Sequence, residues 1–220
     1  PSTANRYLAL VRAILRRAAS EWGWIESAPR VRLYVERSRR IRWLTPEEAE
    51  RLLSELPEHQ EQVARFALAT GLRQANVLKL EWSQVDLGRR VAWIHPDQAK
   101  AGRAIPVPLN ESAVGVLRAR QGNHDRWVFT YNGQRIKQVN TASWKKALRR
   151  AGIRDFRWHD LRHTWASWHI QAGTPLYVLQ ELGGWQNADM VQRYAHLAPE
   201  HLAAHAERII SGTNLTQKEV

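Results

Sequence analysis

Apolar residues recur at spacings of three and four along most of this chain, which is the repeat of helices with one buried face. The first such segment covers residues 4–22, carries arginines on its other faces and is followed by Gly23. Its apolar positions are Tyr7, Val11, Ile14, Ala18 and Trp22. The pattern predicts an amphipathic helix that ends at Gly23 and needs a partner to cover its apolar face.

Further helices are expected from residue 45 onward, each with a start or stop signal. Thr45, Pro46 and Glu48 combine an N-cap hydroxyl, proline in the first turn and a capping glutamate. The other predicted helices are 59–70 stopped by Gly71, a short one after Arg73, one ended near Gly122, one from Asn140 to Gly152, one from Asp160 to about Ala172, one from Thr174 to Gly183, one capped by Asn187 that holds Tyr194, and 199–210.

Residues 84–108 change to the alternating pattern of strands. Three short strands are predicted there, with turns near Gly88 and at 99–102, and Pro106 and Pro108 place the last strand at an edge. A short extended piece is expected at 127–129, followed by a turn. The predicted fold is mainly α-helical with one small three-stranded antiparallel β-sheet.

The composition favours a polyanionic partner. The 220 residues carry a formal net charge of +12, spread along the chain rather than confined to a tail. So many positive groups suit the repeating phosphates of DNA better than a small acidic ligand, although charge alone does not exclude RNA or a membrane surface. No cysteine is present, which excludes disulfides and thiolate metal sites. No signal peptide or membrane span is evident, so we expect a cytoplasmic protein, and Pro1 in place of Met suggests a fragment.

The candidate chemistry gathers late in the chain. An imidazole, a guanidinium, an indole and a phenol lie within residues 159–196, in the segments HDLRH, GW and RYAH. These groups can hold and attack a phosphodiester. A second cluster, ATGLR, ends at Arg73, and Lys100 lies in the predicted hairpin between the two clusters.

These motifs resemble the catalytic domain of the tyrosine recombinases of the phage integrase family. Thr-Gly-Leu-Arg ending at Arg73, the hairpin Lys100, His159-x-x-Arg162, and Trp185 nine residues before Tyr194 occur in the family's order. The match runs from about Leu44 to His196. It implies a site-specific DNA recombinase or integrase of a prophage or mobile element, which cleaves and rejoins strands through a 3′-phosphotyrosine intermediate.

The resemblance assigns a role to each reacting group. Tyr194 is the expected nucleophile, and His159 is expected to accept or relay its proton. Arg73 and Arg162 would stabilise the negative charge of the pentavalent transition state, because each guanidinium is permanently charged and offers paired donors. Trp185 can add only one neutral N–H donor.

Three further residues receive roles from the resemblance. Lys100 is expected to be the general acid that protonates the departing 5′ oxygen, and His163 and His196 are expected to support the reacting groups. The resemblance implies no metal and no nucleotide cofactor.

Two positions depart from the family's usual pattern. Asn76 stands where an acidic residue often follows the first arginine, which is expected to weaken the support of Arg73. Gly183 replaces a bulkier residue and is expected to loosen the turn before Trp185.

The family also suggests how the chain is divided and what it binds. Residues 1–28 would be the last helix of an otherwise missing core-binding domain, 29–44 a basic linker, 45–198 the catalytic domain, and 199–220 a C-terminal helix and tail. The expected partners are double-stranded DNA and further copies of the chain, two at each site and four in synapsis, with no membrane. The candidate DNA-contacting residues are Arg39, Arg40, Arg42, Lys137 and Lys145.

Three other interpretations were weighed. His159, His163 and His169 have the spacing of a metzincin zinc site, but Asp160 is one methylene shorter than the usual glutamate and an unbroken helix would turn His169 away. A non-enzymatic DNA-binding relative would lack some reacting groups, whereas all are present here. A type IB topoisomerase shares the chemistry without exchange of partners, and the size and upstream helix favour the integrase.

Overall fold

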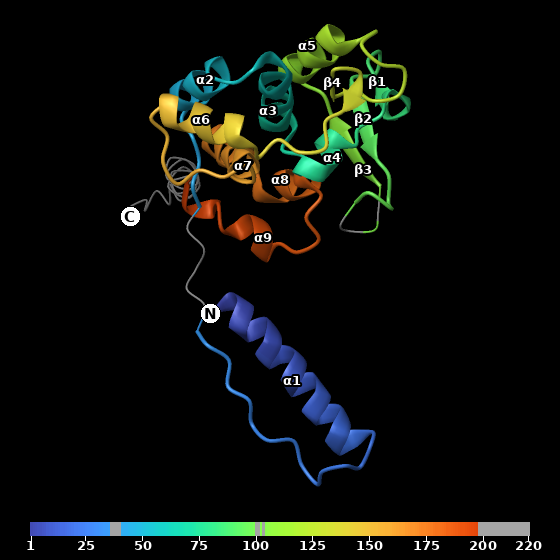
Figure 1. Cartoon of the computed structure of the whole chain (residues 1–220), viewed down its shortest axis with the longest axis vertical. Coiled ribbons are helices and arrows are strands. Elements are labelled where there is room, and N and C mark those ends of the chain that lie inside the picture. The colour runs from blue at the N-terminus through green and yellow to red at the C-terminus, as the bar shows by residue number, and fades with distance from the viewer. Residues whose placement is uncertain (36–40, 100–101, 103, 198–220) are drawn as a thin grey trace, which may run out of the picture. The chain divides into compact units, whose positions relative to one another are not determined.

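The computed structural model describes residues 1–35, 41–99, 102 and 104–197. The chain divides into two compact units, Pro1–Arg40 and Ile41–Val220, which are described separately (Figure 1). The predicted positions Lys100, Arg39 and Arg40 and the predicted helix 199–210 lie outside the described residues.

The first unit contains the predicted amphipathic helix, α1 (Ser2–Ser20), followed by a segment without regular structure. The Asn5 side-chain amide donates to the Tyr34 carbonyl oxygen at 2.9 Å, and the Tyr34 amide donates to Asn5 Oδ1 at 2.8 Å. These two bonds fix the returning segment to the first turn of α1. The side chains of Tyr7, Val11 and Ile14 are exposed, so the described part of this unit leaves the apolar face of α1 uncovered.

The second unit is built mainly from short helices. They are α2 (Pro46–Ser54), α3 (Glu58–Thr70), α4 (Gln74–Leu78), α5 (Glu111–Arg120), α6 (Ala142–Arg150), α7 (Asp160–Gln171), α8 (Leu176–Gly183) and α9 (Asp189–Gln192), with 3-10 turns η1 (Trp82–Gln84) and η2 (Ala195–Leu197). Helix α3 packs against α5 and α7, and α7 also contacts α8 and η2. The described structure therefore confirms the mainly helical fold class.

Local sequence signals explain several helix ends. The Thr45 hydroxyl accepts from the Glu48 amide and the Glu48 carboxylate accepts from the Thr45 amide, which confirms the predicted capping box of α2. Gly71 ends α3 in the left-handed conformation at φ 63°. The prediction for α6 was wrong by one residue, because Thr141 rather than Asn140 precedes the helix.

The prediction for the nucleophile's helix was also wrong. Helix α9 is preceded by Ala188 rather than capped by Asn187, and it ends at Gln192. Tyr194 therefore lies in the turn between α9 and η2, where its amide donates to the Val191 carbonyl at 2.9 Å. The run of apolar residues continued past the point where the helix stops, so periodicity alone did not locate its end.

The predicted three-stranded sheet is confirmed, with β1 (Val85–Asp86), β2 (Val91–Ile94) and β3 (Ile105–Pro108) antiparallel in that order. Pro106 and Pro108 lie on the edge strand β3, where their missing N–H groups cost no sheet hydrogen bond. Figure 1 shows this sheet to one side of the helices. A second ladder of two strands, β4 (Thr130–Tyr131) and β5 (Gln134–Arg135), begins just after the extended piece expected at 127–129.

Two groups of buried side chains fill the second unit. The main core runs from Leu44 to Leu161 and is mostly aliphatic, with side chains such as Leu52, Val63 and Leu117 fully buried. The smaller group, called the aromatic cluster here, consists of Trp165, Ala166, Ile170, Leu179, Trp185, Val191 and Tyr194. None of the described helices has the length and apolar character needed to cross a membrane.

Candidate active site

The phenol of Tyr194 is a buried member of the aromatic cluster, with only 1% of its surface exposed. Its hydroxyl lies 2.5 Å from His163 Nδ1, a short hydrogen bond between the turn after α9 and the middle of α7. Burial raises the pKa of Tyr194 to about 12, although the positive charges of Arg162 and Arg193 act in the opposite direction. The phenol is therefore protonated at neutral pH.

Arg162 joins the separate sequence motifs in space. The side chain is 5% exposed and projects from α7. It donates to the carbonyl oxygen of Gly71 at 2.6 Å and to that of Gly183 at 2.5 Å. The guanidinium carbon also lies 4.2 Å from the centre of the Trp185 ring. One buried cation thus fixes the end of α3, the end of α8 and the indole. These contacts contribute more stability in a site without water than they would in water.

Arg73 brings a second positive charge to the same place. It precedes α4, two residues after Gly71, and is half-buried. Burial, together with the nearby positive charge of Arg73, lowers the pKa of Arg162 to about 9. Burial also lowers the pKa of Arg73. Within the described part of the chain neither guanidinium pairs with a carboxylate, so the two together form a site suited to an anion.

The two histidines of the HDLRH segment have different surroundings. His159 immediately precedes α7 and is exposed, whereas His163 is half-buried one turn later. Their rings meet edge to face with centroids 5.1 Å apart. Burial lowers the pKa of His163 to about 4, with the charge of His159 acting in the same direction. Although the His159 side chain is exposed, partial burial and then the charge of Arg162 lower its pKa as well.

Trp185 is held by two glycines that serve different purposes. A Cβ on Gly183 would lie 2.1 Å from the Trp185 ring, so the missing side chain makes room for the indole. Gly184 ends α8 at φ 60°, and a Cβ there would lie 2.7 Å from Ile105 of β3. Gly183 was expected to loosen the turn, but the indole fills the space instead. The indole face lies against Arg162, a contact that the expected role as an N–H donor did not include.

Asn76 does not support Arg73 as a carboxylate would. The buried side chain donates to the carbonyl oxygen of Gln98 at 3.0 Å. Gln84 donates to the Gln98 side chain at 3.1 Å and to the Trp93 carbonyl at 2.8 Å. These side-chain amides hold Gln98, in the connection that follows β2, two residues before Lys100. Asn76 therefore helps to position this connection.

The remaining predicted residues are not brought into this group. Arg42 is half-buried and pairs with Glu48 at 3.2 Å, which occupies the guanidinium expected to contact DNA. Lys137 and Lys145 are exposed, as that expectation requires. His196 is exposed on η2, and no hydrogen bond connects it to the other described residues.

Two features of the site were missed by the sequence. His163 was expected to support His159 or the phosphate, yet its partner is the Tyr194 hydroxyl. Arg193 was given no role, although its charge acts on both Tyr194 and His163. The position of Arg193 directly before the phenol was an available signal. The bond from His163 had no sequence signal, because the two residues are 31 positions apart.

The zinc-site spacing is not reproduced as a cluster. His169 Nδ1 lies 3.0 Å from the Thr174 hydroxyl, and its ring lies edge-on to Trp165. The described residues contain no group of three or more His, Cys, Asp or Glu side chains that could hold a metal ion. The metzincin-like spacing therefore has no counterpart in space.

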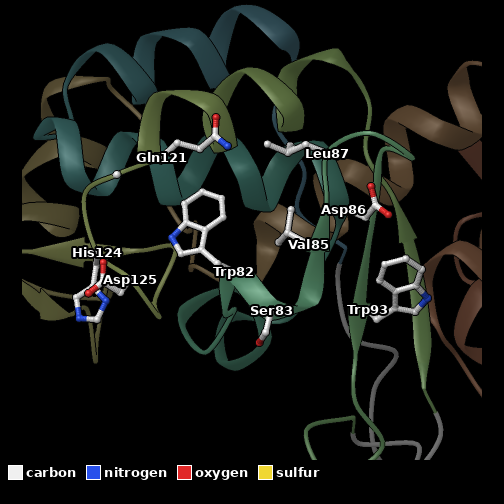
Figure 2. A pocket seen from close by; sticks show the side chains of 10 residues that line it. Trp82, Ser83, Val85, Asp86, Leu87, Trp93, Gln121, His124 and Asp125 are labelled. Carbon is white, nitrogen blue, oxygen red and sulfur yellow. The ribbon is translucent and has the colours of Figure 1, made fainter.

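A cavity of about 750 Å³ lies away from these residues. Figure 2 shows its lining from η1, β1, β2 and the segment after α5, with Trp82, Asp86, Trp93 and His124 among the side chains. None of the candidate catalytic residues lines it. The group around Tyr194 is therefore a better candidate active site than this hollow.

Comparison with known proteins agrees with this geometry. Residues 42–201 match the phage integrase family. The integrase of Salmonella phage P22 is 48% identical over 229 residues, which cover 97% of this chain and 59% of that protein. The chain spans 59% of the P22 integrase, 51% of a shufflon-specific DNA recombinase from Escherichia coli and 58% of the integrase of Haemophilus phage HP1.

Solved structures match the fold as well. The catalytic domain of bacteriophage HP1 integrase is 26% identical, with a TM-score of 0.59 over 76% of this chain and 95% of that one. The Tn1549 transposon integrase, solved in complex with circular intermediate DNA, has a TM-score of 0.64 at 18% identity, over 78% of this chain and 68% of that one.

Proposed function

Since this chain belongs to the phage integrase family, we propose that it is the catalytic part of a site-specific recombinase, in which Tyr194 attacks a DNA phosphodiester. The product would be a 3′-phosphotyrosine bond and a free 5′ hydroxyl, and attack by a different strand's hydroxyl would complete the exchange. A prophage or mobile-element integrase fits the relatives, of which the P22 protein is an integrase.

One observation carries the proposal. The Tyr194 hydroxyl lies in a group with two guanidiniums, Arg73 and Arg162, that no described carboxylate neutralises. Their donors would bind the non-bridging oxygens and stabilise the extra negative charge of the pentavalent transition state. The carbonyl bonds of Arg162 and its contact with Trp185 hold that guanidinium in place before DNA arrives, so little reorganisation is needed during the reaction.

Lys100 is proposed as the acid that protonates the departing 5′ oxygen, on the strength of its sequence position. Two neighbours along the chain support this. Gln98 is held by Asn76 and Gln84, and Ile105 lies against Gly184 directly before Trp185. Both ends of the connection that carries Lys100 are therefore anchored, one of them beside the aromatic cluster.

Duplex DNA is the proposed substrate, supported by the net charge of +12 and by relatives of the same fold solved with DNA. We also propose that two copies act at each site and four in synapsis. Residues 1–28 would then belong to a domain that grips the opposite side of the duplex, which would give the exposed apolar face of α1 a partner.

The test is covalent capture on nicked duplexes whose central sequence is randomised. A nick beside the cleaved bond lets the short fragment that carries the free 5′ hydroxyl diffuse away. The 3′-phosphotyrosine adduct then accumulates and can be isolated, and its DNA can be sequenced. Tyr194→Phe should abolish the adduct while DNA binding survives, because the phenyl ring keeps the packing and loses only the nucleophile. If the wild-type chain binds DNA without forming an adduct, it is a binding module and the proposal is wrong.

A further inference from the structure

The two histidines of α7 differ in one contact that bears on the reaction. Among the described residues, the Tyr194 hydroxyl forms its hydrogen bond with His163 Nδ1, at 2.5 Å. His159, the expected base, has no hydrogen bond with the phenol and touches His163 only edge to face. The nucleophile is thus bonded to the imidazole that follows Arg162 rather than to the one that precedes it.

We propose that His163 is the base that removes the proton from Tyr194, and that His159, on the exposed side of the pair, is free to face the DNA. This assignment rests on the proposed function. It changes the role of both histidines, since the resemblance gave the proton to His159 and support to His163.

The protonation states of both partners allow the phenol to donate its proton to the imidazole. Burial keeps the phenol protonated and the His163 imidazole neutral at pH 7. A neutral imidazole with its ring proton on Nε2 accepts at Nδ1, and the proposal assigns this tautomer to His163, so that the Tyr194 hydroxyl is the donor. The lone pair that a general base needs is already aligned on the O–H bond, within the distance at which proton transfer is efficient.

Proton transfer must accompany the attack rather than precede it. In the resting site a free phenolate beside an imidazolium would be disfavoured by burial of both groups. As the phenolic oxygen bonds to phosphorus it loses basicity, and its proton passes to Nδ1. The P–O5′ bond breaks, and the 5′ oxygen takes a proton from the general acid. Rejoining reverses each step, so the imidazolium returns the proton to the departing phenol.

Other described groups near the phenol are less suited to the task. Arg162 and Arg193 carry guanidinium groups, which offer donors and no acceptor and so can only donate. The Asp160 carboxylate is buried and accepts from the Arg157 amide at 2.8 Å and from its guanidinium at 3.2 Å. Its bonds hold the start of α7, and none reaches Tyr194.

The experiment compares single-turnover adduct formation by the 220-residue chain on the DNA sequence recovered from the wild-type capture. The variants are His163→Gln, His163→Ala and Lys100→Ala. Glutamine can accept the phenol's hydrogen bond but cannot take its proton, so it separates proton removal from positioning. Each variant is tested on the ordinary phosphodiester and on a substrate with sulfur at the 5′ bridging position, because a thiolate with a pKa near 8.5 leaves without a proton.

We expect His163→Gln and His163→Ala to slow adduct formation by about 10²–10⁴-fold on both substrates, the usual contribution of a general base. The sulfur substrate should restore the rate of adduct formation by Lys100→Ala, because the thiolate leaving group does not need the proton that Lys100 would supply. The proposal is overturned if His163→Gln reacts at the wild-type rate, which would make the contact a positioning one, or if sulfur restores the His163 variants, which would place His163 on the leaving group.

The controls separate this inference from the proposed function. Tyr194→Phe and the wild type are the negative and positive controls for adduct formation. If the wild-type chain forms no adduct, the result counts against the proposed function and not against His163 alone. DNA affinity of each His163 variant, and the unfolding midpoint of His163→Gln at pH 7, should match those of the wild type. A variant that binds and folds normally but reacts slowly has lost the proton acceptor.

Discussion

The two groups of buried side chains in the second unit are built on different principles. The main core is mostly aliphatic, and its side chains come from helices and strands whose patterns were readable in the sequence. The aromatic cluster combines two tryptophans and a tyrosine with the buried guanidinium of Arg162 at its edge. In the main core burial supplies stability, whereas in the aromatic cluster burial also sets the protonation states of Tyr194 and His163.

The difference is also one of tolerance. An aliphatic core accepts changes that conserve volume, because its residues make no directional bonds. In the aromatic cluster, glycines, carbonyl groups and rings are matched one to one, as with Gly71 and Trp165 or Gly183 and Trp185. We therefore expect small additions of volume there to cost more than the same additions beside the main core.

The largest effect is expected for Gly71→Ala. The residue has φ 63°, its Cβ would lie 2.3 Å from the Trp165 ring, and its carbonyl accepts from Arg162. Left-handed strain and overpacking should together lower the free energy of unfolding by about 4 kcal/mol. Gly152→Ala is the matched control, since it has φ 71° with nothing within 4 Å of the added Cβ, and it should lose only about 1 kcal/mol. Urea unfolding measures both, and equal losses would contradict the comparison.

Gly183→Ala should have a smaller effect of the same kind. The added methyl group overlaps the Trp185 ring, and displacing that ring should cost about 2 kcal/mol and slow adduct formation by disturbing Arg162. Combining it with Trp185→His should recover stability, because the smaller ring leaves space. Gly115→Ala, at an exposed position of α5 with nothing within 4 Å, should instead stabilise by about 0.5–1 kcal/mol. A Gly183→Ala protein as stable as the wild type would show that the indole has room to move.

The smallest effect is a pH dependence from His163. The folded pKa, about 4, is lower than the ordinary histidine pKa of 6.5. Its contribution to stability is therefore fully present above pH 6.5 and is lost as the pH falls through 4. We expect the wild type to lose about 1 kcal/mol more than His163→Gln between pH 7 and pH 4, allowing for partial exposure. Unfolding free energies of the two proteins at several pH values measure this, and parallel curves would argue against a buried neutral imidazole.

Much of the fold was predictable because its signals are local. The capping box at Thr45, the glycine after α3 and the prolines of β3 each act through the backbone of their own neighbours. The predictions were wrong where no local signal marked the boundary, at the start of α6 and at the end of α9 before Tyr194. Helix ends of this kind are decided by what the next residues pack against.

The sequence alone determined which residues are available for the chemistry and in what order they occur, since Arg73, His159, Arg162, Trp185 and Tyr194 carry reactive groups wherever the chain places them. Only the tertiary structure decided their partners. The bonds from Arg162 to Gly71 and Gly183 and from Tyr194 to His163 span 91, 21 and 31 positions. Contacts at such separations depend on how helices pack, and the burial that shifts the pKa values exists only once that packing is complete.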